Sequence, residues 1–164
     1  MKPYEIYNQS LDFLKGNGVP EDHKKSFRLN AEAAEGGYGD AILAMGWYYL
    51  NGIGVARDIA EANKWYRKSA RLGEPRAMFS LGQIAYVQRD FSAAMRWFQR
   101  AAKAGHSRSV FWIGKLHWHG RGVKENKSAA SRLFNEAAAK KVKEARRAIG
   151  WLNRSKYRSR TNPH

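Results

Sequence analysis

Histidine and carboxylate side chains are where metal or acid–base chemistry would arise in this chain, and their spacing favours neither. His117 and His119 are two positions apart. On a helix of about 3.6 residues per turn they point about 200° apart, so they cannot share a metal ion. Most carboxylates lie at expected helix starts or on the second helix of each expected helix pair. No two of them share the helical face on which a partner is expected below, so no general acid–base dyad is predicted. The sequence predicts no catalytic residue, no metal site and no cofactor.

Glycine-rich turns are the next residues that could do chemistry, by cradling a phosphate. The motif G-x-G-V occurs at 16–19, 52–55 and 120–123. Each copy follows one helical pattern and precedes another, and no GK[ST] accompanies it, so the contexts of phosphate-binding loops are missing. Glycine at a helix end instead favours a left-handed turn. These motifs are therefore predicted to join pairs of helices.

A repeat runs along most of the chain and supplies those helices. Its marker glycines are spaced by 36, 32 and 36 residues, at Gly46, Gly82, Gly114 and Gly150. Each unit is predicted to hold a first helix (A), a turn, a second helix (B) and a glycine exit, and such units bury their apolar faces by stacking. Helix B should start at an N-cap residue and carry a bulky residue four positions before a small pair. The expected caps are Asp22, Asp58, Asp90 and Asn126, and the bulky packing residues are Leu29, Trp65, Trp97 and Leu133.

The pattern A-x-x-x-M-G-x-x-Y-x-x-G-I-G-V-x-x-D-x-x-x-A-x-x-W-Y-x-K-S-A at 41–70 resembles the Sel-one-like repeat, a relative of the tetratricopeptide repeat. The resemblance implies an all-α fold, an α-solenoid of about four helix-turn-helix repeats plus a C-terminal capping helix from Glu144 to about Asn153. We expect a repeat domain at 1–153 and a basic, polar, frayed tail at 154–164. The chain departs from the pattern at Gln88-Arg89-Asp90, which must make the middle turn, and at Lys141, where the other exits have glycine.

Composition indicates the cellular compartment of the protein and the charge of its partner. The 164 residues carry a net charge of +16 and no cysteine, which excludes disulfides and fits a reducing compartment. Between residues 75 and 124, nine Lys and Arg accompany one carboxylate, Asp90. The N-terminus lacks the apolar core of a signal peptide, and no apolar run is long enough to span a membrane. We therefore expect a soluble cytoplasmic protein, monomeric or weakly dimeric, with an acidic partner, and the resemblance implies a bacterial source.

A partner is expected on the A helices, because the resemblance implies that they line the concave face. The residue after each marker glycine shares a helical face with those one turn to either side. We interpret Trp47, Trp118 and Trp151 as contacts, since Met45 and its counterparts already fill the core positions; core and contact are equally open for Phe79 and Phe111. The predicted partner-binding residues are Trp47, Arg76, Phe79, Gln83, Tyr86, Arg108, Phe111, Lys115, Trp118, Arg147 and Trp151.

Two functional hypotheses follow. The first is a non-enzymatic protein-interaction module that binds an acidic partner, as a bacterial adaptor or as an immunity protein that neutralises a toxin. The second is a solenoid that binds single-stranded nucleic acid, because basic and aromatic side chains together suit phosphates and bases. His117 aligns with Tyr49 of an earlier repeat and is interpreted as a packed, hydrogen-bonded side chain.

Overall fold

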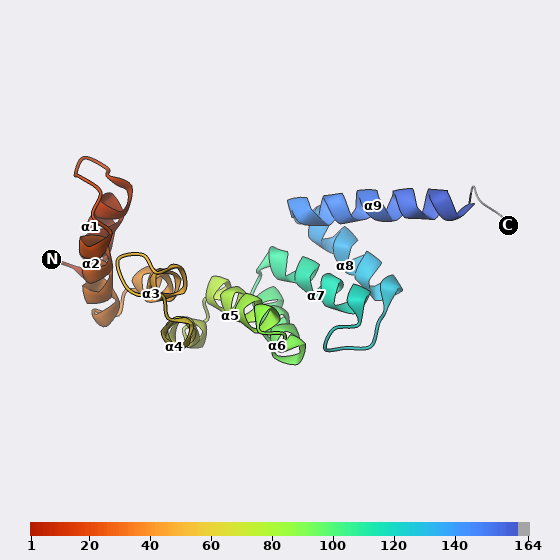
Figure 1. Ribbon diagram of the computed structural model, residues 1–164, viewed down its shortest axis with the longest axis horizontal. Coiled ribbons are helices and arrows are strands. Elements are labelled where there is room, and N and C mark those ends of the chain that lie inside the picture. The colour runs from red at the N-terminus through yellow and green to blue at the C-terminus, as the bar shows by residue number, and fades with distance from the viewer. Residues whose placement is uncertain (161–164) are drawn as a thin grey trace. The chain divides into compact units, whose positions relative to one another are not determined.

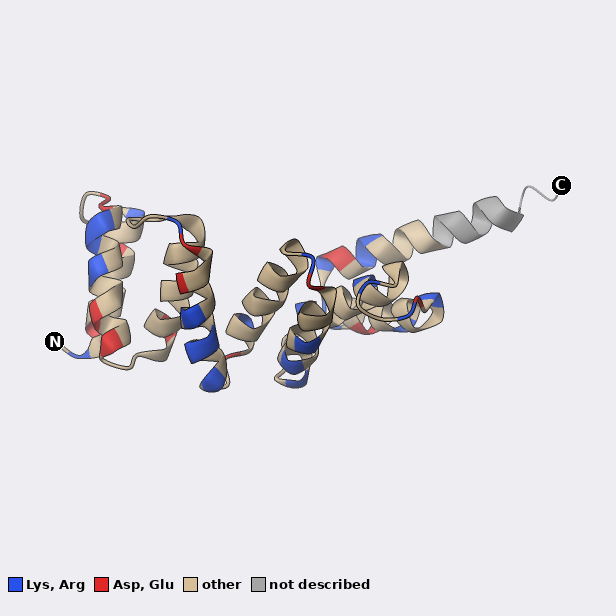
Figure 2. Cartoon of the chain, turned by 60° about the horizontal axis from the view of Figure 1, so that its bottom comes forward, with Lys and Arg blue, Asp and Glu red and all other residues tan. Residues whose placement is uncertain are grey.

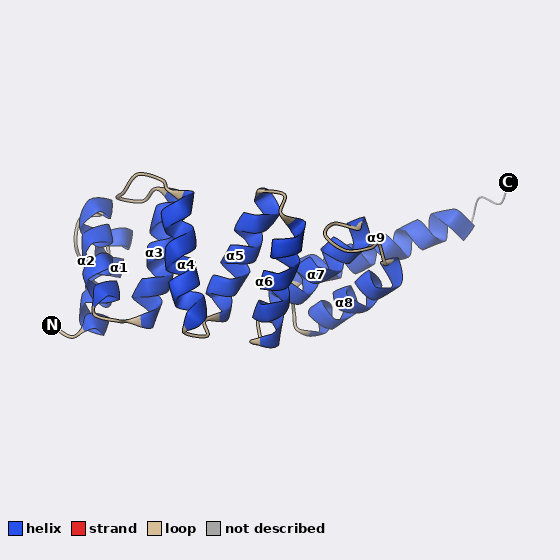
Figure 3. Ribbon diagram, turned by 90° about the horizontal axis from the view of Figure 1, so that it is seen from below, coloured by secondary structure: helices blue, strands red, loops and turns tan. Residues whose placement is uncertain are grey.

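A computed structural model describes the backbone of residues 1–160 and the side chains of residues 1–152. Within that part of the chain the regular structure is entirely helical, as predicted (Figure 3). The helices are α1 (Pro3–Lys15), α2 (His23–Glu35), α3 (Gly39–Asn51), α4 (Ile59–Arg71), α5 (Pro75–Val87), α6 (Phe91–Lys103), α7 (Ser107–His119), α8 (Lys127–Ala139) and α9 (Lys143–Arg160). Odd-numbered helices are the A helices and even-numbered helices the B helices of the predicted repeats.

The chain divides into two compact units, Met1–Leu81 and Gly82 onward, and α5 crosses from one to the other. In the first unit α1 packs on α2, α2 on α3, and α3 on α4 (Figure 1). In the second unit α6 packs on α7, α7 on α8, and α8 on α9. Both units thus contain contacts within a repeat and contacts between consecutive repeats, which is how solenoid repeats bury their apolar faces.

Every predicted N-cap of the B helices is confirmed. The side chain of Asp58 accepts from the backbone N–H groups of Ala60 and Glu61 at the start of α4. The caps at the other B helices each accept from one backbone N–H in the first turn, and they are Asp22, Asp90 and Asn126. These bonds satisfy amide groups that have no partner inside the helix, so the four B helices begin where the sequence predicts.

The turns also follow the sequence. Both glycines of each G-x-G-V motif have positive φ, between 60° and 71°. Where the motif is missing, Arg89 takes the left-handed conformation with φ of 63°, and Lys141 does so at the last exit with φ of 64°. Both substitutes are strained relative to glycine, because a Cβ in this region crowds the following carbonyl.

Helix pairs approach closely at the marker glycines, where an aromatic ring of the B helix packs directly on the glycine. A Cβ at Gly46 would lie 2.6 Å from the ring of Tyr66, and one at Gly82 would lie 2.5 Å from the ring of Phe98. Gly114 meets Phe134 in the same way. These rings follow directly after the predicted bulky row Leu29, Trp65, Trp97 and Leu133, whose members are half-buried. Leu29, Trp65 and Leu133 pack against the buried core, as predicted, and the next residue of each B helix, about 100° further round, is the one that contacts the glycine.

The first repeat replaces this contact with polar groups. Ser10 stands at the marker glycine position and Asn30 at the aromatic position, and both are fully buried. The hydroxyl of Ser26 donates to the carbonyl of Ser10, and it also bonds the hydroxyl of Tyr48. Since a buried polar group without a partner costs free energy, the hydroxyls of Ser26 and Tyr48 depend on one another, whereas Asn30 donates to the carbonyl of Ala41.

The last helix spans Lys143–Arg160. The side chains predicted to form a tail, 154–164, lie outside the described residues, so the boundary at residue 153 stays a prediction. Ile149 of this helix is half-buried, whereas the equivalent Met45, Leu81 and Ile113 are buried. The core predicted for the motif is thus present in the three earlier A helices.

Candidate interaction clefts

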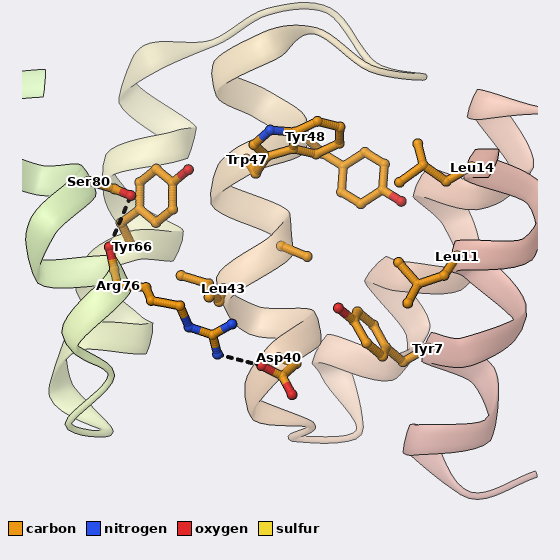
Figure 4. A pocket seen from close by; sticks show the side chains of 11 residues that line it. Tyr7, Leu11, Leu14, Asp40, Leu43, Trp47, Tyr48, Tyr66, Arg76 and Ser80 are labelled. Carbon is orange, nitrogen blue, oxygen red and sulfur yellow. Dashed lines mark hydrogen bonds and ion pairs between the residues drawn. The ribbon is translucent and has the colours of Figure 1, made fainter. Parts of the chain in front are cut away.

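The first unit holds a cleft between its A helices, which we call the N-terminal cleft (Figure 4). Its volume is about 340 Å³. Tyr7 on α1 and Trp47 on the middle helix, α3, both line it, and Trp47 is 41% exposed. The remaining lining is mainly aliphatic and aromatic and comprises Leu11, Leu14, Asp40, Leu43, Ala44, Tyr48, Tyr66, Arg76 and Ser80.

An ion pair closes one side of the N-terminal cleft. Arg76 on α5 donates to Asp40 on α3 over 2.6 Å and to Glu74 over 2.7 Å. Hydrogen bonds to Glu74 and Asp40 raise the pKa of Arg76 above its usual value. Burial, and secondarily the charge of Asp40, raise the pKa of Tyr7. Arg76 was predicted as a cation for an acidic partner, but its charge is already matched by two carboxylates of its own chain.

The second unit holds an aromatic cleft of about 250 Å³ between α7 and α9, which we call the C-terminal cleft. It brings together four of the predicted binding residues, Phe111, Lys115, Trp118 and Trp151. The rings of Trp118 and Trp151 meet edge to face, with centroids 5.7 Å apart. Trp151 nevertheless remains 54% exposed. The rest of the lining is His119, Phe134, Ala148 and Leu152, without a carboxylate.

The charge of the C-terminal cleft comes from Lys115. Its ammonium lies 4.3 Å from the ring centroid of Trp112 and 5.3 Å from that of Tyr86, both cation–π distances. Desolvation, followed by the charges of Arg121 and Lys115, lowers the pKa of His119. Trp112 was missed by the sequence reasoning, which followed one helical face and ignored the position beside it.

Other predicted contacts lie elsewhere. Phe79 is only 7% exposed and belongs to the core, which decides the open choice against partner contact. Gln83 is half-buried and lines neither cleft. Tyr86 packs edge to face on Trp112 with centroids 4.9 Å apart, and its hydroxyl accepts from Arg121. It therefore supports Lys115 rather than lining the cleft.

A third hollow, of about 520 Å³, lies where α7 and α9 begin, and we call it the basic cleft. Arg108 donates through Nε to Glu144 over 2.8 Å, so a second predicted cation is paired within the chain. A backbone hydrogen bond at Glu144, and then the guanidinium of Arg108, lower the pKa of this carboxyl group. The lining comprises His106, Ser107, Arg108, Lys141, Val142, Lys143, Glu144 and Arg147. Figure 2 shows how far Lys and Arg outnumber Asp and Glu along the chain.

His117 departs from its prediction. It is half-buried, as expected, but its Nδ1 is buried without a hydrogen-bond partner among the described residues.

No group of three or more metal-ligating side chains occurs in the part of the chain that the structure describes. None of its helices is apolar over a stretch sufficient to traverse a bilayer.

Comparison with known proteins places the repeats in a family. The model of the Sel1 repeat matches residues 13–38, 39–74, 75–106 and 107–142, which is most of the chain. The chain belongs to the Sel1 repeat family. Sel1 repeat proteins are protein-interaction modules that bind protein partners, and the fold is an all-α solenoid of helical repeats within the tetratricopeptide-like superfamily.

Solved Sel1 repeat structures resemble the chain over most of its length. A Sel1 repeat protein from Oxalobacter formigenes has a TM-score of 0.82 at 30% identity, covering 88% of this chain and 60% of that one. A protective antigen of uropathogenic Escherichia coli with the same fold has a TM-score of 0.83 at 26% identity, covering 92% and 33%. A chitin synthase regulator from Malassezia restricta is 33% identical over 67 residues, which are 41% of this chain and 5% of the regulator. The chain therefore spans only part of these relatives.

The repeat register explains both ion pairs at the clefts. Asp40, Arg76, Arg108 and Glu144 each stand second in their A helix. Equivalent positions of adjacent Sel1 repeats face each other, so opposite charges 36 residues apart form Asp40–Arg76 and Arg108–Glu144. Opposite charges at the equivalent position of adjacent repeats were the sequence signal that could have revealed the two ion pairs.

Proposed function

We propose that this chain is a non-enzymatic interaction module that binds a segment of a protein partner in its C-terminal cleft. The observation that carries the proposal is the exposure of Trp151 beside the half-buried Trp118 in an apolar hollow. Contiguous exposed apolar surface marks interaction sites, and tryptophan is prominent among residues that dominate binding energy. A non-polar side chain of the partner would remove this surface from water.

The cleft suits an anchor residue rather than a small polar ligand. The rings of Phe111 and Phe134 have centroids 5.5 Å apart, Trp118 contacts Phe134 with centroids 6.4 Å apart, and Trp151 contacts Trp118, so the four rings form a continuous aromatic lining. The lining offers few groups that could orient a substrate or move a proton. We therefore assign the cleft to recognition. Its titratable side chains are Lys115 and His119, and no carboxylate accompanies them in the lining.

The finer proposal concerns the partner. We propose an acidic protein, because the net charge of +16 would speed its association and orient it. A module with binding clefts acts by holding or covering its partner. This fits an adaptor, and it equally fits an immunity protein that masks a surface of a toxin.

The test is a selection of random peptides displayed on phage against the full chain. We expect sequences with an aromatic or large aliphatic residue to be enriched, and Trp151→Ala to lower their affinity by about tenfold, the order expected for a hot-spot residue. Trp97→Ala is the matched control, because Trp97 lies on B helix α6 and lines neither the N-terminal cleft nor the C-terminal cleft. Equal loss of affinity in both variants would contradict the proposal.

A titration with random single-stranded DNA examines the competing hypothesis. Binding to phosphates weakens steeply as salt rises, whereas an apolar anchor is nearly insensitive to salt. Tight DNA binding with a steep salt dependence, unaffected by Trp151→Ala, would replace the proposed function with nucleic-acid binding through the basic side chains.

A further inference from the structure

The basic cleft carries positive charge that the chain does not neutralise. Four of its lining residues are Lys or Arg, and Glu144 is its one carboxylate, so the excess is 4 − 1 = 3 positive charges with His106 neutral. Arg108 uses Glu144. Among the described residues Lys141 and Lys143 form no ion pair with a carboxylate, and Arg147 acts on Glu144 through its charge without a direct ion pair. The hollow is thus complementary to carboxylates supplied by another molecule.

Lys141 occupies this cleft at a conformational cost. It has φ of 64° at a repeat exit where the three earlier repeats have glycine, at Gly37, Gly73 and Gly105. A side chain in this region costs about 1–2 kcal/mol relative to the ordinary right-handed conformation. Residues held in such conformations are concentrated at functional sites. Here the strained residue adds a cation to the wall of the basic cleft.

The basic cleft and the C-terminal cleft follow one another along the same two helices. On α7, Arg108 lines the first and Phe111 and Lys115 line the second. On α9, Arg147 lines the first, and Ala148 and Trp151 line the second. Residues three or four positions apart share a helical face, so the hollows form one strip that is basic at the start of the helices and aromatic further on.

We propose that this strip binds one linear segment of the partner, with carboxylates in the basic cleft and an aromatic or large aliphatic side chain in the C-terminal cleft. This inference rests on the proposed function and adds the motif that the site recognises. From Arg108 to Lys115 the helix rises about 10 Å, at about 1.5 Å per residue. The acidic and apolar positions are therefore about three residues apart in an extended segment, or about seven in a helical one.

Synthetic fluorescent peptides test the motif directly. Each carries two adjacent aspartates, a Gly-Ser spacer of variable length and one tryptophan, and a matched set has asparagine in place of aspartate. Fluorescence polarisation with the full chain should show tightest binding at one of the two predicted spacings. The asparagine peptides should bind about tenfold more weakly, the order seen for charge pairs at interfaces.

Charge reversal at neighbouring positions separates local recognition from net charge. Arg147→Glu should weaken the aspartate peptide about tenfold and leave the asparagine peptide nearly unchanged. Arg146→Glu is the control, because Arg146 is adjacent and exposed, lines neither cleft and changes the net charge equally. Equal effects of the two reversals, or equal affinity for aspartate and asparagine peptides, would overturn the motif.

The same peptides distinguish failure of this inference from failure of the proposed function. If Trp151→Ala weakens every peptide but the aspartates contribute nothing, the anchor site stands and the acidic half of the motif is wrong. If Trp151→Ala has no effect on any peptide that binds, both are wrong. Circular dichroism of each variant verifies that the helices are retained.

Discussion

The second glycine of the G-x-G-V turn should be essential only where a preceding repeat lies against it. Gly54 has φ of 69°, and a Cβ there would overlap the carbonyl group of His23, with its carbon 2.6 Å away. Gly18 has the same conformation, with φ of 71°, but no heavy atom lies within 4 Å of its would-be Cβ. The two alanine substitutions therefore share a backbone penalty and differ in crowding, within one unit of the chain.

The magnitudes follow from that difference. An alanine in the left-handed conformation destabilises the folded state by about 1–2 kcal/mol. Alanine also lowers the conformational entropy of the unfolded chain, which offsets about 0.4–1 kcal/mol of that loss. Gly18→Ala should thus reduce the free energy of unfolding by about 1 kcal/mol. Gly54→Ala adds overpacking against backbone that cannot rotate away, about 1–3 kcal/mol, for a total of about 2–4 kcal/mol.

Urea unfolding followed by circular dichroism measures both variants against the unmodified chain. The midpoint should fall further for Gly54→Ala than for Gly18→Ala while the slope stays constant. Equal midpoints would refute the reasoning, because they would mean that the turn of the second repeat does not rest on the start of α2.

Three further predictions concern strain, charge and buried polarity. Lys141→Gly should raise the free energy of unfolding by about 0.5–1 kcal/mol by removing left-handed strain; a lower urea midpoint would contradict this. Glu144→Gln should cost less than about 1 kcal/mol at pH 7, since the pair with Arg108 is exposed. The folded-state pKa of Glu144 is depressed, so its contribution is present above the unfolded value of about 4.3 and is lost as pH falls through the folded value; a difference that persists at the acid limit would contradict this in thermal unfolding. Ser26→Ala should cost about 1–3 kcal/mol by leaving the buried Tyr48 hydroxyl without that partner, whereas adding Tyr48→Phe should restore part of the loss; additive losses in urea would refute the coupling.

Local signals made the fold predictable. Caps such as Asp58 and left-handed turns such as that at Gly52 depend on a few consecutive residues, so they can be deduced from the sequence directly. Even the turn at Arg89 follows from its position between two helical patterns. The bulky row was predicted, whereas the contact between Gly82 and Phe98 was not, because the side chain that reaches the glycine is set by the exact rotation of the two packed helices.

The site was predictable in part. Helical spacing brought Phe111, Lys115, Trp118 and Trp151 to one face, and the structure places all four around one cleft. It could not show which cations were already paired, because that depends on contacts between repeats. The basic cleft was missed for the same reason: its residues come from two helix starts and one turn.

The central claim is that a partner segment binds in the C-terminal cleft, against Trp118 and Trp151. The most direct measurement is fluorine NMR of the full chain labelled with fluorotryptophan, titrated with the selected peptide and assigned by single substitutions. The account predicts that the resonances of Trp118 and Trp151 move on binding while those of Trp65 and Trp97 stay in place. Saturable binding that moves Trp65 or Trp97 and leaves the cleft tryptophans unchanged would contradict it.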